Sequence, residues 1–147
     1  MKKKQLNFGL IGSGFMGRTH ALGLSIANRV FDLPYKLHLE KIADVSHTLA
    51  CRAAEELSVP QYTNDWKELT QDSSIDVINI TAPNAFHKEM ALAAIKAGKH
   101  VHIEKPHVIS FKQLQELELA INSNKNSRVF LGFNRPRSKV FKKLNSF

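Results

Sequence analysis

The residues of this sequence best suited to bind a ligand are three glycines near the N-terminus. Gly12, Gly14 and Gly17 follow a short apolar run in the order G-x-G-x-x-G, and a helical pattern begins directly after them. This arrangement is typical of a turn that binds the pyrophosphate of a dinucleotide. The first glycine allows a tight turn, the second lets the backbone approach the pyrophosphate, and the third lets the helix pack closely on the sheet. A glycine-rich turn of some other α/β protein is the alternative.

The start of the helix after these glycines is itself suited to an anion. Its first N–H groups have no partner within the helix, and the helix dipole is positive at this end. A phosphate group is therefore favoured without any basic side chain.

A carboxylate is expected at the opposite end of the same ligand. Asp44 lies at the end of the next predicted strand, 35–45, where it can accept hydrogen bonds from the adenosine ribose hydroxyls. Glu40 is the alternative by distance along the chain, but it lies in the middle of that strand. The nearest arginine, Arg52, follows a helical turn or more later, so nothing obvious binds a 2′-phosphate. Because Asp44 would repel that phosphate, the sequence predicts NAD as the cofactor and disfavours NADP.

Strands and helices that alternate along the whole chain must position these groups. We predict strands at 8–11, 35–45, 61–63, 76–80, 100–103 and 129–132, with helices at 15–29, 48–57, 65–69, 88–97 and 111–122. The first helix is expected to bury Leu22 and Ile26, and helix 88–97 to bury Met90, Ala91, Ala94 and Ile95. Such alternation indicates an α/β fold of the Rossmann type, a doubly wound parallel sheet covered on both faces.

Length and charge limit the classes of function. At 147 residues the chain is most simply one domain, and it has no apolar run near the ~20 residues that span a bilayer, so we expect a cytoplasmic protein. The formal charge of +8 comes from the two ends, because residues 5–134 carry 13 basic and 13 acidic side chains. A basic groove for nucleic acid is therefore not predicted on the body.

Several stretches together resemble one family, the glucose–fructose oxidoreductase and inositol dehydrogenase family (Gfo/Idh/MocA). The matching segments are GLIGSGFMGRTH at 9–20, AD at 43–44, TAPNAFH at 81–87, AGKHVHIEKP at 97–106 and GFNR at 132–135. Their order and spacing match over nearly the whole chain. The E-K-P tripeptide at a strand end, together with P-N-x-x-H, is more specific than the glycines alone.

The resemblance implies a domain that presents the nicotinamide ring of a cofactor to a sugar or polyol. Lys105 of E-K-P would be the catalytic residue, holding the substrate and the nicotinamide, and Glu104 would hold neighbouring groups in place. Asn84 and His87 would line the cofactor cleft, although His87 could equally cap a helix or be solvated. The predicted cofactor-binding residues are Gly12, Gly14, Phe15, Met16, Gly17, Asp44, Thr81, Pro83, Asn84, His87, Glu104 and Lys105.

The sequence departs from the family at two places. Members are about twice as long, with a C-terminal α+β domain whose histidine acts as general acid or base. We expect this chain to lack that domain, with an NAD(P)-binding Rossmann domain at 1–134 and a basic amphipathic tail at 135–147 that begins the link to it. His107 stands where members generally have an apolar residue; a solvated histidine is favoured over a substitute acid–base group.

Three interpretations follow. The chain is the nucleotide-binding part of a truncated sugar dehydrogenase, unable to transfer hydride alone because no group would move the hydroxyl proton. Alternatively, it is a non-catalytic module that binds NAD(H), or a protein-interaction module that uses its basic ends. Loss of a partner domain would leave apolar surface uncovered, so we also expect a homo-oligomer.

Overall fold

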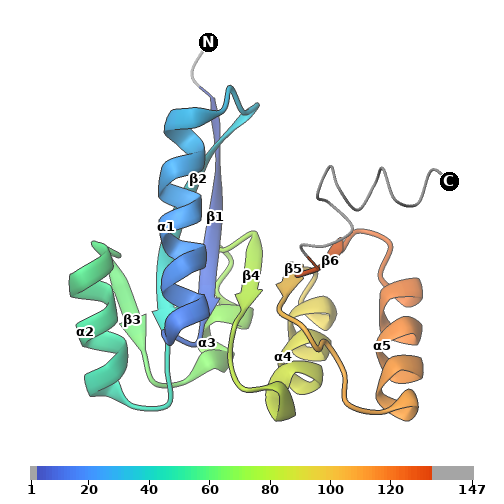
Figure 1. Ribbon diagram of the computed structural model, residues 1–147. Coiled ribbons are helices and arrows are strands. Elements are labelled where there is room, and N and C mark those ends of the chain that lie inside the picture. The colour runs from blue at the N-terminus through green and yellow to red at the C-terminus, as the bar shows by residue number, and fades with distance from the viewer. Residues whose placement is uncertain (1–2, 134–147) are drawn as a thin grey trace, which may run out of the picture.

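The computed structural model describes residues 3–133 and contains one sheet of six parallel strands. The strands are β1 (Lys4–Ile11), β2 (Tyr35–Ala43), β3 (Gln61–Thr63), β4 (Val77–Ile80), β5 (His100–Ile103) and β6 (Val129–Leu131). Their order in the sheet is β3-β2-β1-β4-β5-β6 (Figure 1). The direction of winding reverses between β1 and β4, and ligands of such sheets bind at the carboxyl ends of the strands at this switch point.

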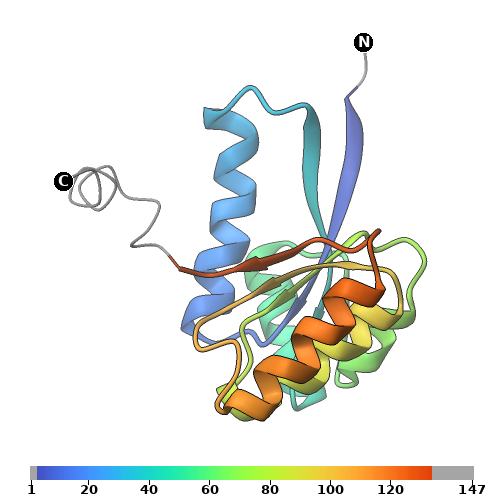
Figure 2. The ribbon, with the colours of Figure 1, turned by 90° about the vertical axis from the view of Figure 1, so that its right-hand side faces the viewer.

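Five helices connect the strands and cover the two faces of the sheet. They are α1 (Phe15–Val30), α2 (His47–Leu57), α3 (Trp66–Gln71), α4 (Asn84–Lys96) and α5 (Phe111–Ser123). Figures 1 and 2 show α1 and α2 on one side of the sheet, with α4 and α5 packed side by side on the other. The predicted α/β, doubly wound parallel fold is confirmed. The predicted tail at 135–147 lies outside the described residues.

The two faces bury cores of unequal size. The larger core lies under α3, α4 and α5, where Ile78, Ile80 and Val101 of the central strands meet the predicted face of α4, Met90, Ala91, Ala94 and Ile95. The smaller core lies under α1 and α2 and joins Leu10 and Ile42 to the alanines of those helices. Alternate residues of β4 therefore enter the larger core, as the two-residue period of a strand requires.

The buried face predicted for α1 was wrong. Leu22 and Ile26 are each 54% exposed, and the buried residues of the helix are Gly17 and Ala21. The helix approaches β1 and β2 through small side chains, because its first turn must lie close to the glycine turn. The larger apolar side chains are consequently displaced to the flank of the helix.

Serines begin two of the helices. Ser46 accepts a hydrogen bond from Leu49 N at the start of α2, and Ser110 accepts one from Gln113 N at the start of α5. The helix predicted at 88–97 begins earlier, at Asn84, directly after Pro83. A proline is tolerated at this end because its missing N–H is not needed there. As a result, His87 lies within α4 rather than in a loop.

Candidate functional site

A groove of about 880 Å³ lies at the switch point, across the carboxyl ends of β1, β2 and β4. Its floor is the glycine turn that follows β1, and its sides come from α1, α2 and α4. The lining residues include Gly12, Ser13, Gly14, Phe15, Met16, Arg18, Asp44, Val45, Leu49, Arg52, Trp66, Thr81, Pro83, Phe86 and Met90. The groove joins the loops that follow three neighbouring strands, as a dinucleotide-binding site requires.

The backbone of the glycine turn excludes side chains at two of its positions. Gly12 has φ +94°, and a Cβ there would lie 2.9 Å from Ala82 N. A Cβ on Gly17 would lie 2.0 Å from the Gly12 carbonyl oxygen, so α1 can pack here only through glycine. By contrast, a Cβ on Gly14 would meet nothing within 4 Å. The absence of a side chain at Gly14 is therefore not needed for packing, and it leaves space on the groove side of the turn.

The turn is held firmly, while the end of α1 is left open. Gly12 N donates to Ala43 O (2.8 Å), and Thr81 Oγ1 donates to Gly12 O (2.8 Å). Gly14 is the N-cap residue of α1, no side chain caps this end, and no acidic residue lies in the first turn. The free N–H groups of that turn therefore form an anion site of the kind that binds a pyrophosphate. These features fit a dinucleotide.

Asp44 lies at the end of β2, at the α2 side of the groove, as predicted. Its Oδ2 accepts hydrogen bonds from Ser13 N (2.7 Å) and Ser13 Oγ (2.5 Å), and its Oδ1 accepts one from Val45 N (2.7 Å). The carboxylate is thus oriented beside the glycine turn before any ligand binds. A carboxylate has about four acceptor sites, so it can still accept from ribose hydroxyls.

His87, predicted to line the groove, is instead buried beneath it with 1% of its surface exposed. Its Nε2 lies 2.6 Å from Ala82 O and its Nδ1 lies 2.9 Å from Pro106 O. The imidazole therefore joins the loop after β4 to the loop after β5. Asn84, at the start of α4, is exposed and is also not part of the lining.

Glu104, at the end of β5, belongs to a partly buried polar network that reaches α1. His20 Nε2 lies 3.1 Å from Glu104 Oε1, and His20 Nδ1 lies 3.0 Å from Asn79 Oδ1. His102 Nδ1 lies 3.0 Å from the same Asn79 oxygen, and its ring stacks on that of His20 at 5.0 Å. Glu104 Oε2 also accepts a hydrogen bond from Lys105 N (3.1 Å). Glu104 therefore links the loop of Lys105 to α1, and its role towards a cofactor stays a prediction.

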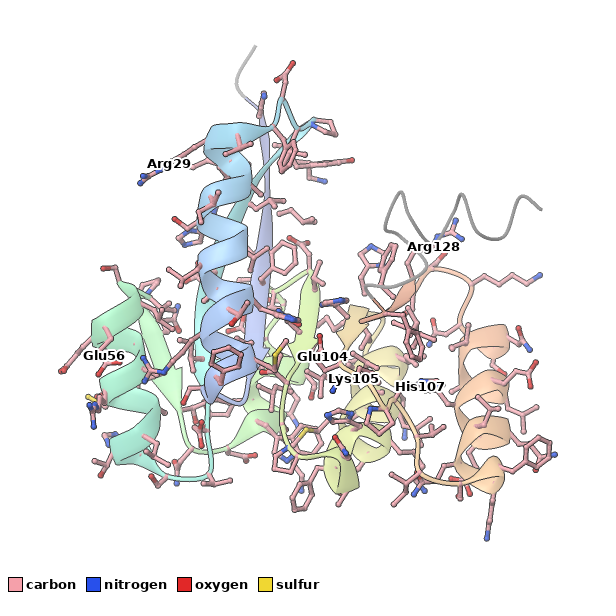
Figure 3. All side chains as sticks on the ribbon, in the orientation of Figure 1. Arg29, Glu56, Glu104, Lys105, His107 and Arg128 are labelled. Atoms are coloured by element: carbon pink, nitrogen blue, oxygen red, sulfur yellow. The ribbon has the colours of Figure 1, made fainter. Side chains whose placement is uncertain are left out.

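Lys105 and His107 lie just beyond this network, where Figure 3 shows them near the end of β5. Lys105 is exposed and precedes Pro106 through a cis peptide bond. His107, favoured as a solvated histidine, is half-buried against Phe133, with ring centroids 6.0 Å apart. Burial and the neighbouring His87 lower the pKa of His107, and its buried Nδ1 has no hydrogen-bond partner among the described residues.

Two arginines also line the groove: Arg52, which the sequence analysis set aside as too far from the end of β2, and Arg18, which it did not consider. Arg18 comes from α1 and Arg52 from α2, and both are paired with Glu56 of α2. Figure 3 shows Glu56 and Glu104 on opposite sides of the first turns of α1. The i, i+4 spacing of Arg52 and Glu56 could have predicted that ion pair from the sequence, whereas no pattern in the sequence predicted a contact with Arg18.

The structure brings most of the predicted cofactor residues into one groove. Gly12, Gly14, Phe15, Met16, Asp44, Thr81 and Pro83 line it, while Gly17 supports the turn from below. Lys105 and Glu104 lie outside the lining, at the neighbouring strand end. The sequence analysis missed Ser13, which orients Asp44, and the contact between His20 and Asn79. A polar asparagine within the apolar strand β4 could have indicated that a buried hydrogen-bond partner lies beside it.

The fold and the groove together define a Rossmann-type dinucleotide-binding domain. The strand order, the glycine turn, the open end of α1 and the carboxylate after β2 are the parts of such a site. The family model "Oxidoreductase family, NAD-binding Rossmann fold" matches residues 6–133, and the chain belongs to this family, Gfo/Idh/MocA. The predicted membership and, at the level of the family, the predicted NAD cofactor are confirmed.

Similar proteins include dehydrogenases named for levoglucosan and for myo-inositol. The chain is 40% identical over 104 residues to the levoglucosan dehydrogenase of Pseudarthrobacter phenanthrenivorans, covering 70% of this chain and 27% of that protein. It is 31% identical to the myo-inositol 2-dehydrogenase of Thermotoga maritima, covering 95% and 39%. A levoglucosan dehydrogenase structure in complex with NADH and levoglucosan superposes with TM-score 0.90 at 32% identity, covering 97% and 40%.

The chain therefore spans between 27% and 40% of the length of these relatives. In the described part of the chain, no helix has both the length and the apolar character needed to cross a membrane.

Proposed function

We propose that this chain is the NAD(H)-binding part of a sugar or polyol dehydrogenase, and that it binds the cofactor but does not transfer hydride alone. The observation that carries the proposal is the groove at the switch point. There, the open N-terminus of α1 and the space beside Gly14 fit a pyrophosphate, and Asp44 fits a ribose. The names of the relatives support the substrate class.

In this proposal a small set of residues at the strand ends binds the cofactor and the substrate. The first N–H groups of α1 bind the pyrophosphate, and Asp44 accepts hydrogen bonds from the adenosine ribose. Thr81 and Pro83 form the wall of the groove on the side of β5. Lys105, just after the end of β5, holds the substrate hydroxyl. Bound NAD⁺ would accept the hydride. Glu104 keeps the loop of Lys105 in place through its hydrogen bonds to Lys105 N and His20.

A titration with NADH tests the binding. Trp66, the only tryptophan of the chain, lines the groove, so bound NADH is expected to quench its fluorescence by energy transfer. Asp44→Asn should weaken binding, whereas Asp32→Asn, which removes an exposed carboxylate paired with Lys3, should not. No saturable signal with the folded wild-type chain would refute the proposal.

A panel of polyols and sugars with NAD⁺ tests the second half of the proposal. Binding without turnover is expected from the chain alone, because this proposal assigns none of the described residues to move the hydroxyl proton. Robust reduction of NAD⁺ by the purified chain would contradict it. A cytoplasmic location stays a prediction.

A further inference from the structure

The end of the groove near Asp44 contains a charge arrangement that NAD binding does not require. Arg18 and Arg52 both line this end, and their guanidinium groups converge on one carboxylate, that of Glu56. Arg52 Nε donates to Glu56 Oε1 at 2.7 Å, and Arg18 Nη1 donates to Glu56 Oε2. Each carboxylate oxygen thus engages one arginine, while Glu56 itself is not part of the groove lining.

These two arginines are the side chains best suited to bind a 2′-phosphate. A guanidinium group presents a fork of N–H donors that matches a phosphate, and an arginine near the ribose is how Rossmann domains accept NADP. Here Glu56 engages one nitrogen of each guanidinium group, Nε of Arg52 and Nη1 of Arg18, and its negative charge lies between the two. Hydrogen bonds from Arg52 and Arg18 lower the pKa of Glu56, so its carboxylate is ionised at neutral pH.

We propose that Glu56 is a specificity-determining residue: by holding Arg18 and Arg52, it withholds their charge from the 2′ position and leaves Asp44 to select NAD(H) over NADP(H). The inference rests on the proposed binding of NAD(H) to this groove. It predicts that cofactor preference depends on a residue of α2 that lines no part of the groove.

The test compares the ratio of dissociation constants for NADPH and NADH in wild type and in Glu56→Gln. The substitution removes the single negative charge that offsets one of the two arginine charges, and it leaves a side chain of the same size. We expect the ratio to shift towards NADPH by up to about fivefold, the upper range for one exposed ion pair. The shift should shrink as salt is added, since the new attraction is electrostatic.

Glu55→Gln is the matched control, because it makes the same charge change one residue earlier on the same helix. Glu55 is exposed and contacts Cys51 rather than an arginine of the groove (Sγ to Oε1, 3.6 Å). Its ratio should match that of wild type. Adding Arg52→Gln to Glu56→Gln should return the ratio towards wild type. Glu56→Asp, which keeps the charge on a shorter side chain, should give an intermediate ratio.

The outcomes separate the inference from the function on which it rests. If wild type does not bind NADH, the proposed function fails. If wild type binds NADH but Glu56→Gln leaves the ratio unchanged, or if Glu55→Gln shifts it equally, the role of Glu56 is refuted. Should Glu56→Gln not fold, the same comparison between wild type and Glu56→Asp decides.

Discussion

Adding one methyl group to Gly17 should damage the fold and the groove together. In Gly17→Ala the new Cβ would lie 2.0 Å from the Gly12 carbonyl oxygen, where real Cβ contacts below 3.0 Å essentially never occur. Helix α1 must therefore retreat by about 1 Å, and both sides of the clash are backbone, so no side-chain rotation can relieve it. The retreat also disturbs Thr81, whose Oγ1 would lie 3.0 Å from the Cβ and donates to Gly12 O.

The magnitude follows from two opposing effects. Overpacking at a tight site costs about 1–3 kcal/mol, and alanine is about 1 kcal/mol better than glycine within a helix. With a backbone clash at the upper end of the first range, we expect a net loss of about 2 kcal/mol, or about 6 °C in Tm for a chain of this size. Urea unfolding followed by circular dichroism measures it, and NADH binding should weaken in parallel.

Gly23→Ala is the control, because it makes the same change in the same helix. A Cβ there would meet nothing within 4 Å, so only the helix propensity remains and stability should rise by up to about 1 kcal/mol. A Gly17→Ala variant as stable as wild type, or equal effects of the two substitutions, would refute the packing argument.

Three further predictions concern other parts of the chain. Gly14→Ala should leave the free energy of unfolding unchanged, because the new Cβ meets no protein atom within 4 Å. It should weaken NADH binding in the Trp66 assay, because the Cβ would occupy space that the pyrophosphate needs; binding equal to that of wild type would contradict this. Hydrogen bonds from Ser74 and Lys41 lower the pKa of Asp72 to about 2, below its unfolded value near 4. Its stabilising effect is thus complete above the unfolded pKa and is lost as pH falls towards 2, so Asp72→Asn should cost about 1 kcal/mol at pH 7 and progressively less below pH 4; a difference in urea unfolding that stays constant or grows as pH falls would contradict this. Finally, the exposed Leu22 and Ile26 of α1 should promote the predicted self-association, so replacing both with lysine should lower the mass measured by light scattering; a monomeric wild-type chain at high concentration would contradict the prediction.

The sequence was sufficient for features that depend on local spacing. The glycine turn, Asp44 at the end of β2 and the buried face of α4 could all be predicted, because each rests on neighbours within a turn or a strand. The face of α1 could not, since hydrophobicity favours burying Leu22 whereas the close approach at Gly17 rotates a smaller face inward. Helix propensity and apolar pattern do not include that constraint from the turn.

Contacts between residues far apart in the chain were likewise beyond prediction. His20 and Glu104 are 84 positions apart, and their contact depends on α1 crossing the sheet beside the end of β5. The resemblance pointed to His87 as a groove residue, but the early start of α4 turns its imidazole to the carbonyl groups of Ala82 and Pro106. A motif identifies which residues matter without saying which of them touch the ligand.

The two ends of the groove are built differently, and this difference predicts how each responds to change. Towards β5 the loops are held by histidines: the buried His87 joins two backbone carbonyls, and the partly buried His20 joins Glu104 to Asn79. Removing a partner there leaves a buried polar group unsatisfied, which costs about 1–3 kcal/mol. At the Asp44 end the charges of Glu56 and its arginines lie on the surface, where exposed ion pairs contribute little to stability. Cofactor preference can therefore change at Glu56 with little effect on folding, whereas changes around Lys105 must preserve the buried network beneath it.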